Sequence, residues 1–206
     1  QLQANAGNTT AGISTALSGE RTANQPLLLN TGGTLQLRSD SAVTFAGANN
    51  FGGLGSATVT IDVNQLTASG SNNAITLAPG GFSVSISTIN VSGGNGYSLR
   101  LPVITSVGAN TSTFNGNTAP LSIGNYSATV TGNHVLGLGG TNTGNVVTGV
   151  ISNGLGTTVG ILKTGTGTWD VQGANTNTGP ITASEGLLRP TGAKTGPVSL
   201  SAPKAA

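Results

Sequence analysis

Apolar and polar residues alternate along most of the chain, in short runs that are typical of β-strands. Residues 35–37, 59–63 and 84–86 place an apolar side chain at every second position, with a polar residue between. The same alternation recurs at residues 75–77, 99–101, 121–123 and 169–171. Because successive side chains of a strand point to opposite faces, this period of two predicts strands that bury one face.

Clusters rich in Gly, Asn, Ser and Thr separate these runs, for example at residues 30–33, 46–50 and 92–96. Gly and Asn accept the positive φ that tight turns require. Apolar residues do not recur at the three- and four-residue spacing of a helix, and Gly interrupts almost every window long enough to form one. We therefore expect an all-β protein with almost no helix.

The apolar runs return at a nearly constant interval, which indicates stacked repeats. Leu35, Val59 and Val84 follow one another at intervals of roughly 20–25 residues, and so do Leu99 and Leu121. Repeats of this length, which cannot bury their own apolar face, are typical of solenoids. We predict a parallel β-helix with about 22 residues per rung and roughly nine rungs. A β-sandwich would also contain many short strands, but its two sheets usually enclose more aromatic residues than the 3% found here.

The alternation divides the chain into three parts. We assign residues 27–188 to the β-helix, residues 1–26 to an irregular N-terminal coil or cap, and residues 189–206 to a loop or last partial rung. Neither end shows an amphipathic helix that would cover the stack. Strands left uncovered present unpaired backbone groups, which favour end-to-end pairing with another copy.

The predicted stacking has one consequence for charged residues. If residues 35–38 lie in register on residues 59–62, Arg38 lies over Asp62 on the outer face. We therefore expect an ion pair between these two side chains, which belong to neighbouring rungs.

The small number of charged residues excludes several classes of function. Only 6% of the residues are charged and the net charge is +2, whereas globular domains usually carry about 25% charged residues. The seven Lys and Arg residues are never adjacent, so we expect no nucleic-acid partner. The longest apolar run, residues 27–29, is too short to span a membrane. The absence of cysteine removes disulfides and cysteine-ligated zinc, and it fits an exported bacterial protein.

The most specific motif lies in residues 161–188. A Lys-x-Gly-x-Gly-Thr run follows aliphatic residues, and Gly-x-Asn-Thr-x-x-Gly and Gly-x-Leu come after it. The positions that carry the motif are Leu162, Lys163, Gly165, Gly167, Thr168, Gly173, Asn175, Thr176, Gly179, Gly186 and Leu187. This segment resembles the autotransporter-associated β-strand repeat of large exported bacterial proteins. It departs from that repeat at Trp169, where an aliphatic residue is usual, and at Pro180, in a strand that is usually rich in Thr.

The resemblance implies a right-handed β-helix outside the cell, within an adhesin or another large surface protein, where the repeat aids folding and export. We therefore expect a non-enzymatic extracellular structural protein at the surface of a bacterium. It would act as a passenger, stalk or fibre subunit for surface display, adhesion or matrix building. Its expected partners are further copies of itself, stacked head to tail into a filament, or glycans of host or neighbouring surfaces.

A second hypothesis is a carbohydrate-binding adhesin module. It requires exposed aromatic rings for sugars to stack on, and the candidates are Trp169, Tyr97 and Tyr126. The four phenylalanines are expected to fill the interior or the corners of the coil instead: Phe45, Phe51, Phe82 and Phe114.

A polysaccharide-degrading enzyme is the third hypothesis. General acid–base hydrolysis of polysaccharides needs two carboxyl groups about 5–10 Å apart. The five acidic residues are instead scattered along the chain: Glu20, Asp40, Asp62, Asp170 and Glu185. We therefore expect no catalytic residue.

Metal and cofactor sites are not expected either. His134 is the only histidine, so we expect it in a turn or at the surface rather than in a metal cluster or a Ser–His pair. Residues 93–99 resemble a calcium-binding nonapeptide, but Tyr97 stands where an Asp is needed.

Overall fold

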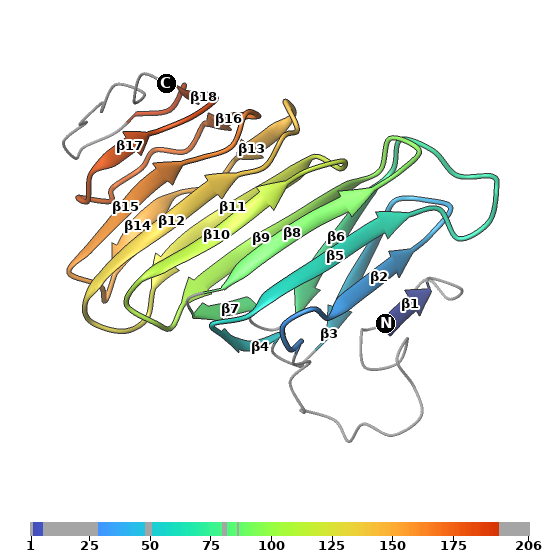
Figure 1. The fold of residues 1–206 in the computed structure, drawn as a ribbon, viewed down its shortest axis with the longest axis horizontal. Helices are drawn as coiled ribbons and strands as arrows, with labels where there is room; N and C mark the ends of the chain where they lie inside the picture. Colours follow the sequence, from blue (N-terminus) through green and yellow to red (C-terminus); the bar gives the residue numbers. More distant parts are fainter. Residues whose placement is uncertain (1, 6–28, 48–50, 80–81, 86, 194–206) are drawn as a thin grey trace.

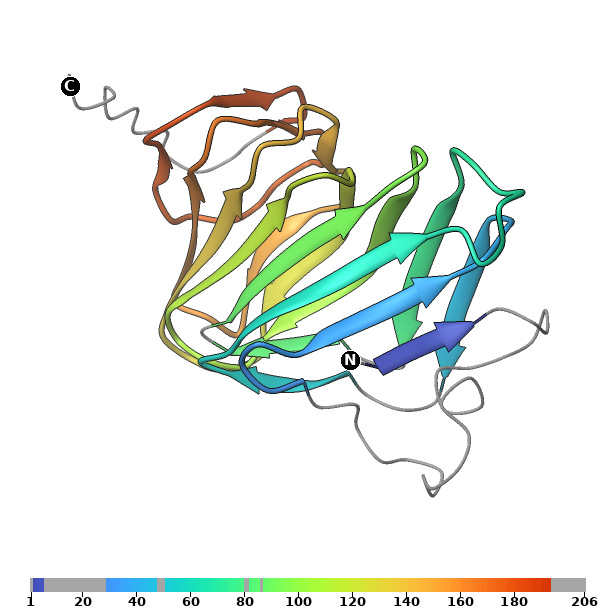
Figure 2. The ribbon, with the colours of Figure 1, turned by 45° about the vertical axis from the view of Figure 1, so that its right-hand side comes forward.

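The computed structural model of this chain describes residues 2–5, 29–47, 51–79, 82–85 and 87–193. These residues form eighteen β-strands and no helix, which confirms the all-β expectation. The strands pair in parallel, and the chain winds through them as a β-solenoid of about six turns (Figures 1 and 2). The parallel β-helix is therefore confirmed, whereas the prediction of roughly nine rungs is wrong.

Two sheets enclose the core. Sheet A contains, in order, β1 (Leu2–Asn5), β2 (Thr34–Arg38), β5 (Thr58–Asn64), β8 (Thr88–Gly93), β10 (Thr111–Gly116), β12 (Asn133–Gly139), β15 (Thr158–Lys163) and β17 (Ile181–Ala183). Sheet B contains β3 (Val43–Gly47), β4 (Phe51–Gly55), β6 (Ala74–Pro79), β7 (Phe82–Ser85), β9 (Ser98–Ser106), β11 (Leu121–Ala128), β13 (Asn145–Val147), β14 (Ile151–Gly154), β16 (Thr168–Val171) and β18 (Leu187–Pro190). The chain alternates between the sheets and advances by about one strand per turn.

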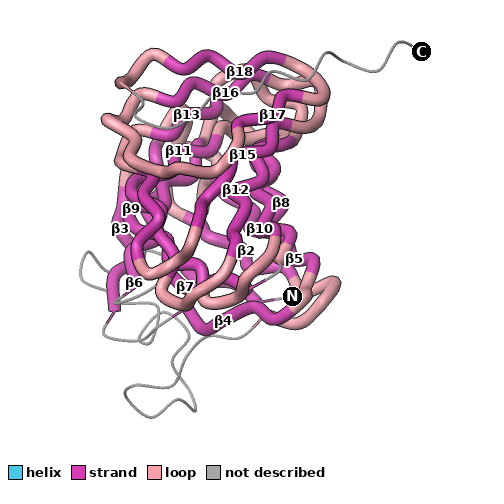
Figure 3. The backbone as a smooth tube through the Cα atoms, turned by 90° about the vertical axis from the view of Figure 1, so that its left-hand side faces the viewer, coloured by secondary structure: helices cyan, strands magenta, loops and turns pink. Residues whose placement is uncertain are grey.

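Sheet B has two halves that two long strands bridge (Figure 3). Strand β9 pairs with both β6 and β7, and strand β11 pairs with both β13 and β14. Between the halves, Gly124 of β11 lies against Pro102 of β9, and a Cβ at Gly124 would overlap the carbonyl oxygen of Pro102. Glycine is therefore needed at position 124 because the two backbones approach too closely for any side chain.

The turns differ in length, which explains the lower number of rungs. Val59 pairs with Ile89 and not with Val84, which lies in sheet B. Ile161 and Ile181, which pair between β15 and β17, lie much closer together in the sequence than Val59 and Ile89 do. Loops such as residues 65–73, between β5 and β6, lengthen some turns well beyond the predicted interval.

The register also differs from the prediction at one point. Leu99 pairs with Leu121 as predicted, but Leu35 pairs with Ile61, two positions beyond Val59. A shift of two residues keeps every side chain on its own face. The alternating pattern therefore fits both registers equally well.

The ends of the predicted β-helix fall partly outside the described residues. Of the predicted N-terminal coil or cap, residues 1–26, the structure describes β1, which pairs with β2 in sheet A. At the other end, strand β18 crosses the predicted boundary between residues 188 and 189.

The core consists of inward-facing ladders of apolar side chains, one from each turn. Buried members include Ile75, Leu99 and Leu121 of sheet B and Ile89, Phe114 and Leu138 of sheet A. Phe45 and Phe82 are buried as predicted, and the side chain of Phe51 lies outside the described residues. Burial of these side chains is the main term that holds one turn on the next.

Candidate functional sites on the solenoid

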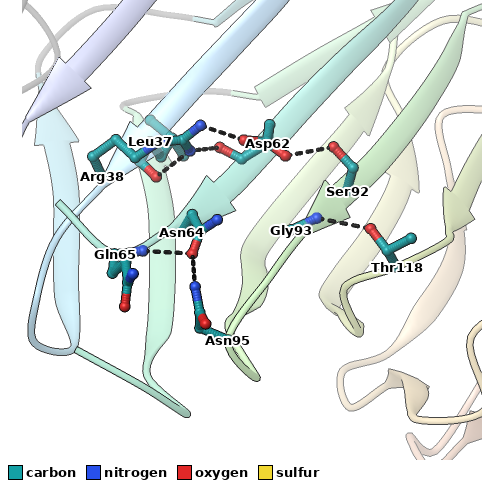
Figure 4. Close-up of polar contacts among 9 residues, drawn as sticks. All are labelled: Leu37, Arg38, Asp62, Asn64, Gln65, Ser92, Gly93, Asn95 and Thr118. Carbon is teal, nitrogen blue, oxygen red and sulfur yellow. Dashed lines mark hydrogen bonds and ion pairs between the residues drawn. The ribbon is translucent and has the colours of Figure 1, made fainter. Parts of the chain in front are cut away.

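The predicted ion pair between Arg38 and Asp62 is present, although the register is shifted. Arg38 lies beside Asn64 in the strand pairing, and its Nη2 reaches diagonally to Asp62 Oδ2 while its Nη1 donates to the carbonyl oxygen of Asp62 at 2.9 Å. On the next turn, Ser92 Oγ donates to Asp62 Oδ1 at 2.7 Å. Figure 4 shows this chain of contacts, with Asn95 Nδ2 donating to Asn64 Oδ1 beside it. Three successive turns are thus connected through one carboxylate.

Asp40 and Asp170, the other described aspartates, also connect neighbouring turns. Asp40 accepts the backbone N–H groups of Leu66 and Thr67 at 3.0 and 2.8 Å, and the hydroxyl of Thr67 at 2.8 Å. The hydrogen bond from the Thr67 N–H is the main cause that lowers the pKa of Asp40. Asp170 accepts from Arg189 Nε at 2.6 Å and from Arg189 Nη2 at 3.0 Å. Each of these carboxylates binds a residue of the adjacent turn.

The described side chains offer no cluster for a metal ion. No group of three or more His, Cys, Asp or Glu side chains that could hold a metal ion occurs in the part of the chain that the structure describes. Glu185 interacts through its backbone carbonyl oxygen, which accepts from Lys163 Nζ at 3.2 Å. Glu20 lies outside the described residues.

The three rings proposed for sugar stacking are buried, so the prediction that they form an exposed platform is wrong. Trp169 donates from Nε1 to the carbonyl oxygen of Gly139 at 2.9 Å, and the Tyr97 hydroxyl donates to that of Ser39 at 2.5 Å. Tyr126 is completely buried, and desolvation raises its pKa. These side chains face the core because the inner positions of the coil offer the apolar volume that aromatic rings need.

His134 is also buried, which corrects the expectation of a turn or surface position. It lies in β12, where Nδ1 is 2.9 Å from Ser106 Oγ and Nε2 is 3.0 Å from the carbonyl oxygen of Val130. A Ser–His pair is therefore present, contrary to the sequence prediction. Both side chains are closed to solvent and the second ring nitrogen faces a carbonyl rather than a carboxylate, so the pair lacks the access and the orienting acid of a nucleophilic site.

Lys163, the cation of the repeat-like motif, points into the core and is completely buried. It follows Leu138 in the sheet A ladder, and its Nζ donates to the carbonyl oxygens of Thr164, Gly165 and Glu185 at 2.6, 2.7 and 3.2 Å. Desolvation lowers the pKa of Lys163, and the charge of Glu185 opposes this effect. The ammonium group thus ties the end of β15 to the loop before β18.

The glycines of the motif stand where backbones meet. Gly165 and Gly186 have positive φ angles of 66° and 69°, which favour glycine. A Cβ at Gly173 would overlap the carbonyl oxygen of Gly149 in the preceding turn. Close backbone approaches also occur at Gly167 and Gly179.

The remaining motif residues complete the contact with the turn below. Asn175 Oδ1 accepts from the Ile151 N–H at 2.8 Å, and the Thr176 N–H donates to the Ile151 carbonyl oxygen at 2.9 Å. Thr168 pairs with Leu187. Leu162 pairs with Thr182. The motif residues therefore contribute to the stacking of one turn on the next.

A groove on the outer face of sheet B was not predicted from the sequence. It has a volume of about 680 Å³ and is lined by residues of β6, β9, β11 and β13 and of their adjoining loops. Arg100 lies in it, exposed, with Thr76 and Ser122 beside it in register on the neighbouring strands. Gly124 and Gly144 also line the groove.

The alternation at residues 99–101 already placed Arg100 on the outer face. Its surroundings were beyond sequence reasoning, because Thr76 and Ser122 belong to the preceding and the following turn and reach it only through the strand pairing.

Comparison of the chain with protein-family models, with curated proteins and with solved structures finds no match. The described residues contain no helix that could cross a membrane. The function of the chain must therefore be inferred from its fold and its contacts.

Proposed function

We propose that this chain is a non-enzymatic structural module, a β-helical passenger or stalk segment of an exported bacterial surface protein. The observation that carries the proposal is the use of its charged side chains. Asp40, Asp62 and Asp170 each bind a neighbouring turn, and Lys163 binds backbone carbonyls inside the coil. An enzyme would gather such charged side chains at a cavity. In this chain they hold neighbouring turns together.

The motif of residues 161–188 supports the bacterial surface location by its resemblance to a repeat of exported proteins. The contacts of the motif explain physically how such a repeat would aid export. Each turn binds mainly the turn before it, so folding can proceed along the axis as the chain emerges. We also propose that the coil is right-handed, which the resemblance implies and which crossover connections between parallel strands strongly favour.

The outer edges of the last strands, β18 and β17, decide where a second copy could pair head to tail. In β18, the N–H of Leu187 donates to the Gly167 carbonyl oxygen at 3.1 Å, and the N–H of Thr191 donates to that of Val171 at 2.9 Å. Because N–H directions alternate along a strand, Pro190 occupies a position whose N–H would point away from the stack. Proline has no N–H to donate there. The outer edge of β18 therefore lacks one of the hydrogen-bond donors that pairing with another copy would use.

Strand β17 keeps its outward donors. The N–H of Ser184 donates to the Lys163 carbonyl oxygen at 2.9 Å, so the N–H of Ala183, one residue earlier, is directed away from β15. We therefore place the proposed head-to-tail joint at β17.

Sedimentation velocity and negative-stain electron microscopy over a concentration series test this joint. We expect filaments of the wild-type chain, isolated rods of Ala183→Pro, and longer filaments of Pro190→Val, which restores a donor to β18. Rods of constant length at every concentration would contradict the joint and leave a stalk that works within one chain. Release of reducing ends from a polysaccharide panel would contradict the non-enzymatic assignment.

The proposed surface location is tested by displaying the chain on the surface of bacterial cells. The chain is placed between a signal peptide and an outer-membrane anchor in a Gram-negative host, and its exposure is measured with antibody and protease. We expect a protease-resistant segment on intact cells, and degradation of a Trp169→Ala variant with a damaged core. Retention of the folded wild-type segment in the periplasm would contradict the proposal.

A further inference from the structure

We propose that the groove around Arg100 binds an acidic polysaccharide, with a carboxylate of the sugar chain on the Arg100 guanidinium. This role goes beyond that of a stalk, and neither depends on the other. The groove contains residues of four successive strands of sheet B, β6, β9, β11 and β13. At a strand spacing of about 4.8 Å it extends roughly 14 Å along the solenoid axis. An extended polymer can therefore lie along it, across the strands.

The charge of the groove selects an anion. Among the described residues that line the groove, Arg100 is the only charged one. The other described cations are occupied: Arg38 by Asp62, Arg189 by Asp170, and Lys163 by carbonyl oxygens. Arg100 makes no hydrogen bond or ion pair within the described part of the chain. Its planar guanidinium is free to bind a carboxylate through two parallel hydrogen bonds.

The rest of the lining fits a sugar better than a nucleic acid. Hydroxyl groups of Thr76 and Ser122 lie on both sides of Arg100 and can exchange hydrogen bonds with sugar hydroxyls. Pro102 and Pro120 provide apolar ring faces. The described residues that line the groove include no aromatic side chain for bases to stack on, and one cation neutralises too few phosphates for a nucleic-acid backbone.

The test uses immobilised polygalacturonate, and the same polymer with its carboxyl groups methyl-esterified, in biolayer interferometry with the full chain. We expect binding to the acid polymer that weakens with salt, and little binding to the ester. Arg100→Gln should weaken binding about tenfold, the loss expected for a charge-assisted hydrogen bond. Arg189→Gln is the matched control: it removes the same charge from the same sheet outside the groove, and affinity should stay within about twofold.

Ser122→Ile tests the groove without changing charge. A β-branched residue suits the strand, and its bulk should reduce binding to the level of Arg100→Gln while the circular dichroism spectrum stays that of the wild type. If Arg100→Gln fails to fold, Ser122→Ile still tests whether the groove binds the polymer. Three results would each overturn the proposal: equal losses in the two arginine variants, full binding by Ser122→Ile, or equal binding of the ester or of a single-stranded oligonucleotide.

Discussion

The central turns and the last turns of the solenoid fill the same interior with different side chains. In sheet B, the ladder of Ile75, Leu99 and Leu121 is purely aliphatic. The next two turns continue it with Asn145 and Trp169. In sheet A, the apolar ladder that ends with Leu138 is followed by Lys163. In these two ladders, inward polar residues thus appear toward the C-terminal end, although His134 and Ser106 are buried in the central turns.

This difference shows two ways of stacking turns. Apolar ladders are held by burial, which is non-directional and tolerates exchange of similar volumes. Polar inward groups must each find a partner, because a buried donor or acceptor without one is costly. Asn145 meets this need by accepting from the Leu121 N–H at 3.0 Å and donating to the Asn142 carbonyl oxygen at 2.8 Å. The last turns should therefore be more sensitive to the loss of a single polar group.

The largest effect is expected at Trp169. Replacement by Ala removes the largest buried side chain and leaves the Gly139 carbonyl oxygen without its donor. We expect a loss of about 3–5 kcal/mol in the free energy of unfolding, measured by urea denaturation. Trp169→Phe keeps most of the ring and should cost clearly less. A loss below about 1 kcal/mol for Trp169→Ala would mean that this ring does not hold the last turns.

Lys163→Met compares a polar inward position with an apolar one, Leu138, in the same ladder of sheet A. The thioether chain fills a similar volume but leaves three carbonyl oxygens without a donor, a penalty that removal of a buried charge only partly offsets. We expect a loss of about 2 kcal/mol. Leu138→Met, one turn earlier, is the matched control and should cost less than about 1.5 kcal/mol. Equal costs at the two positions would remove the distinction between the two regions.

Lys163 also predicts a dependence of stability on pH. Its pKa is lowered in the folded state, so between that value and the ordinary lysine pKa the unfolded chain binds more protons. Stability should therefore rise with pH in this window, which we would follow by urea denaturation from about pH 8 to about pH 10. Above the ordinary tyrosine pKa, the raised pKa of Tyr126 acts in the opposite direction. A slope that persists in Lys163→Met would assign the effect to another group.

The sequence predicted what depends on local alternation and missed what depends on register. The strands and the inward side of Leu99 and Leu101 follow from the period of two. The same rule applied to residues 169–171 places Trp169 inside with Val171, which corrects the assignment of this ring as a surface candidate. The number of turns and the residues that lie beside Arg100 on the neighbouring strands were not predictable, because loop lengths vary and a shift of two residues preserves every face.

The smallest effect is expected at Asp40, whose carboxylate joins two loops near the surface rather than two ladders in the core. Its pKa is lowered mainly by the Thr67 N–H, so its contribution is present above the ordinary aspartate pKa and disappears as pH falls through the lowered value. Asp40→Asn keeps an oxygen acceptor and removes the charge. The stability difference between wild type and Asp40→Asn should therefore shrink as pH falls from about 5 to about 2 in urea denaturation. A constant difference over this range would show that the Asp40 carboxylate acts only by its shape, and that its charge contributes nothing to the joining of these two loops.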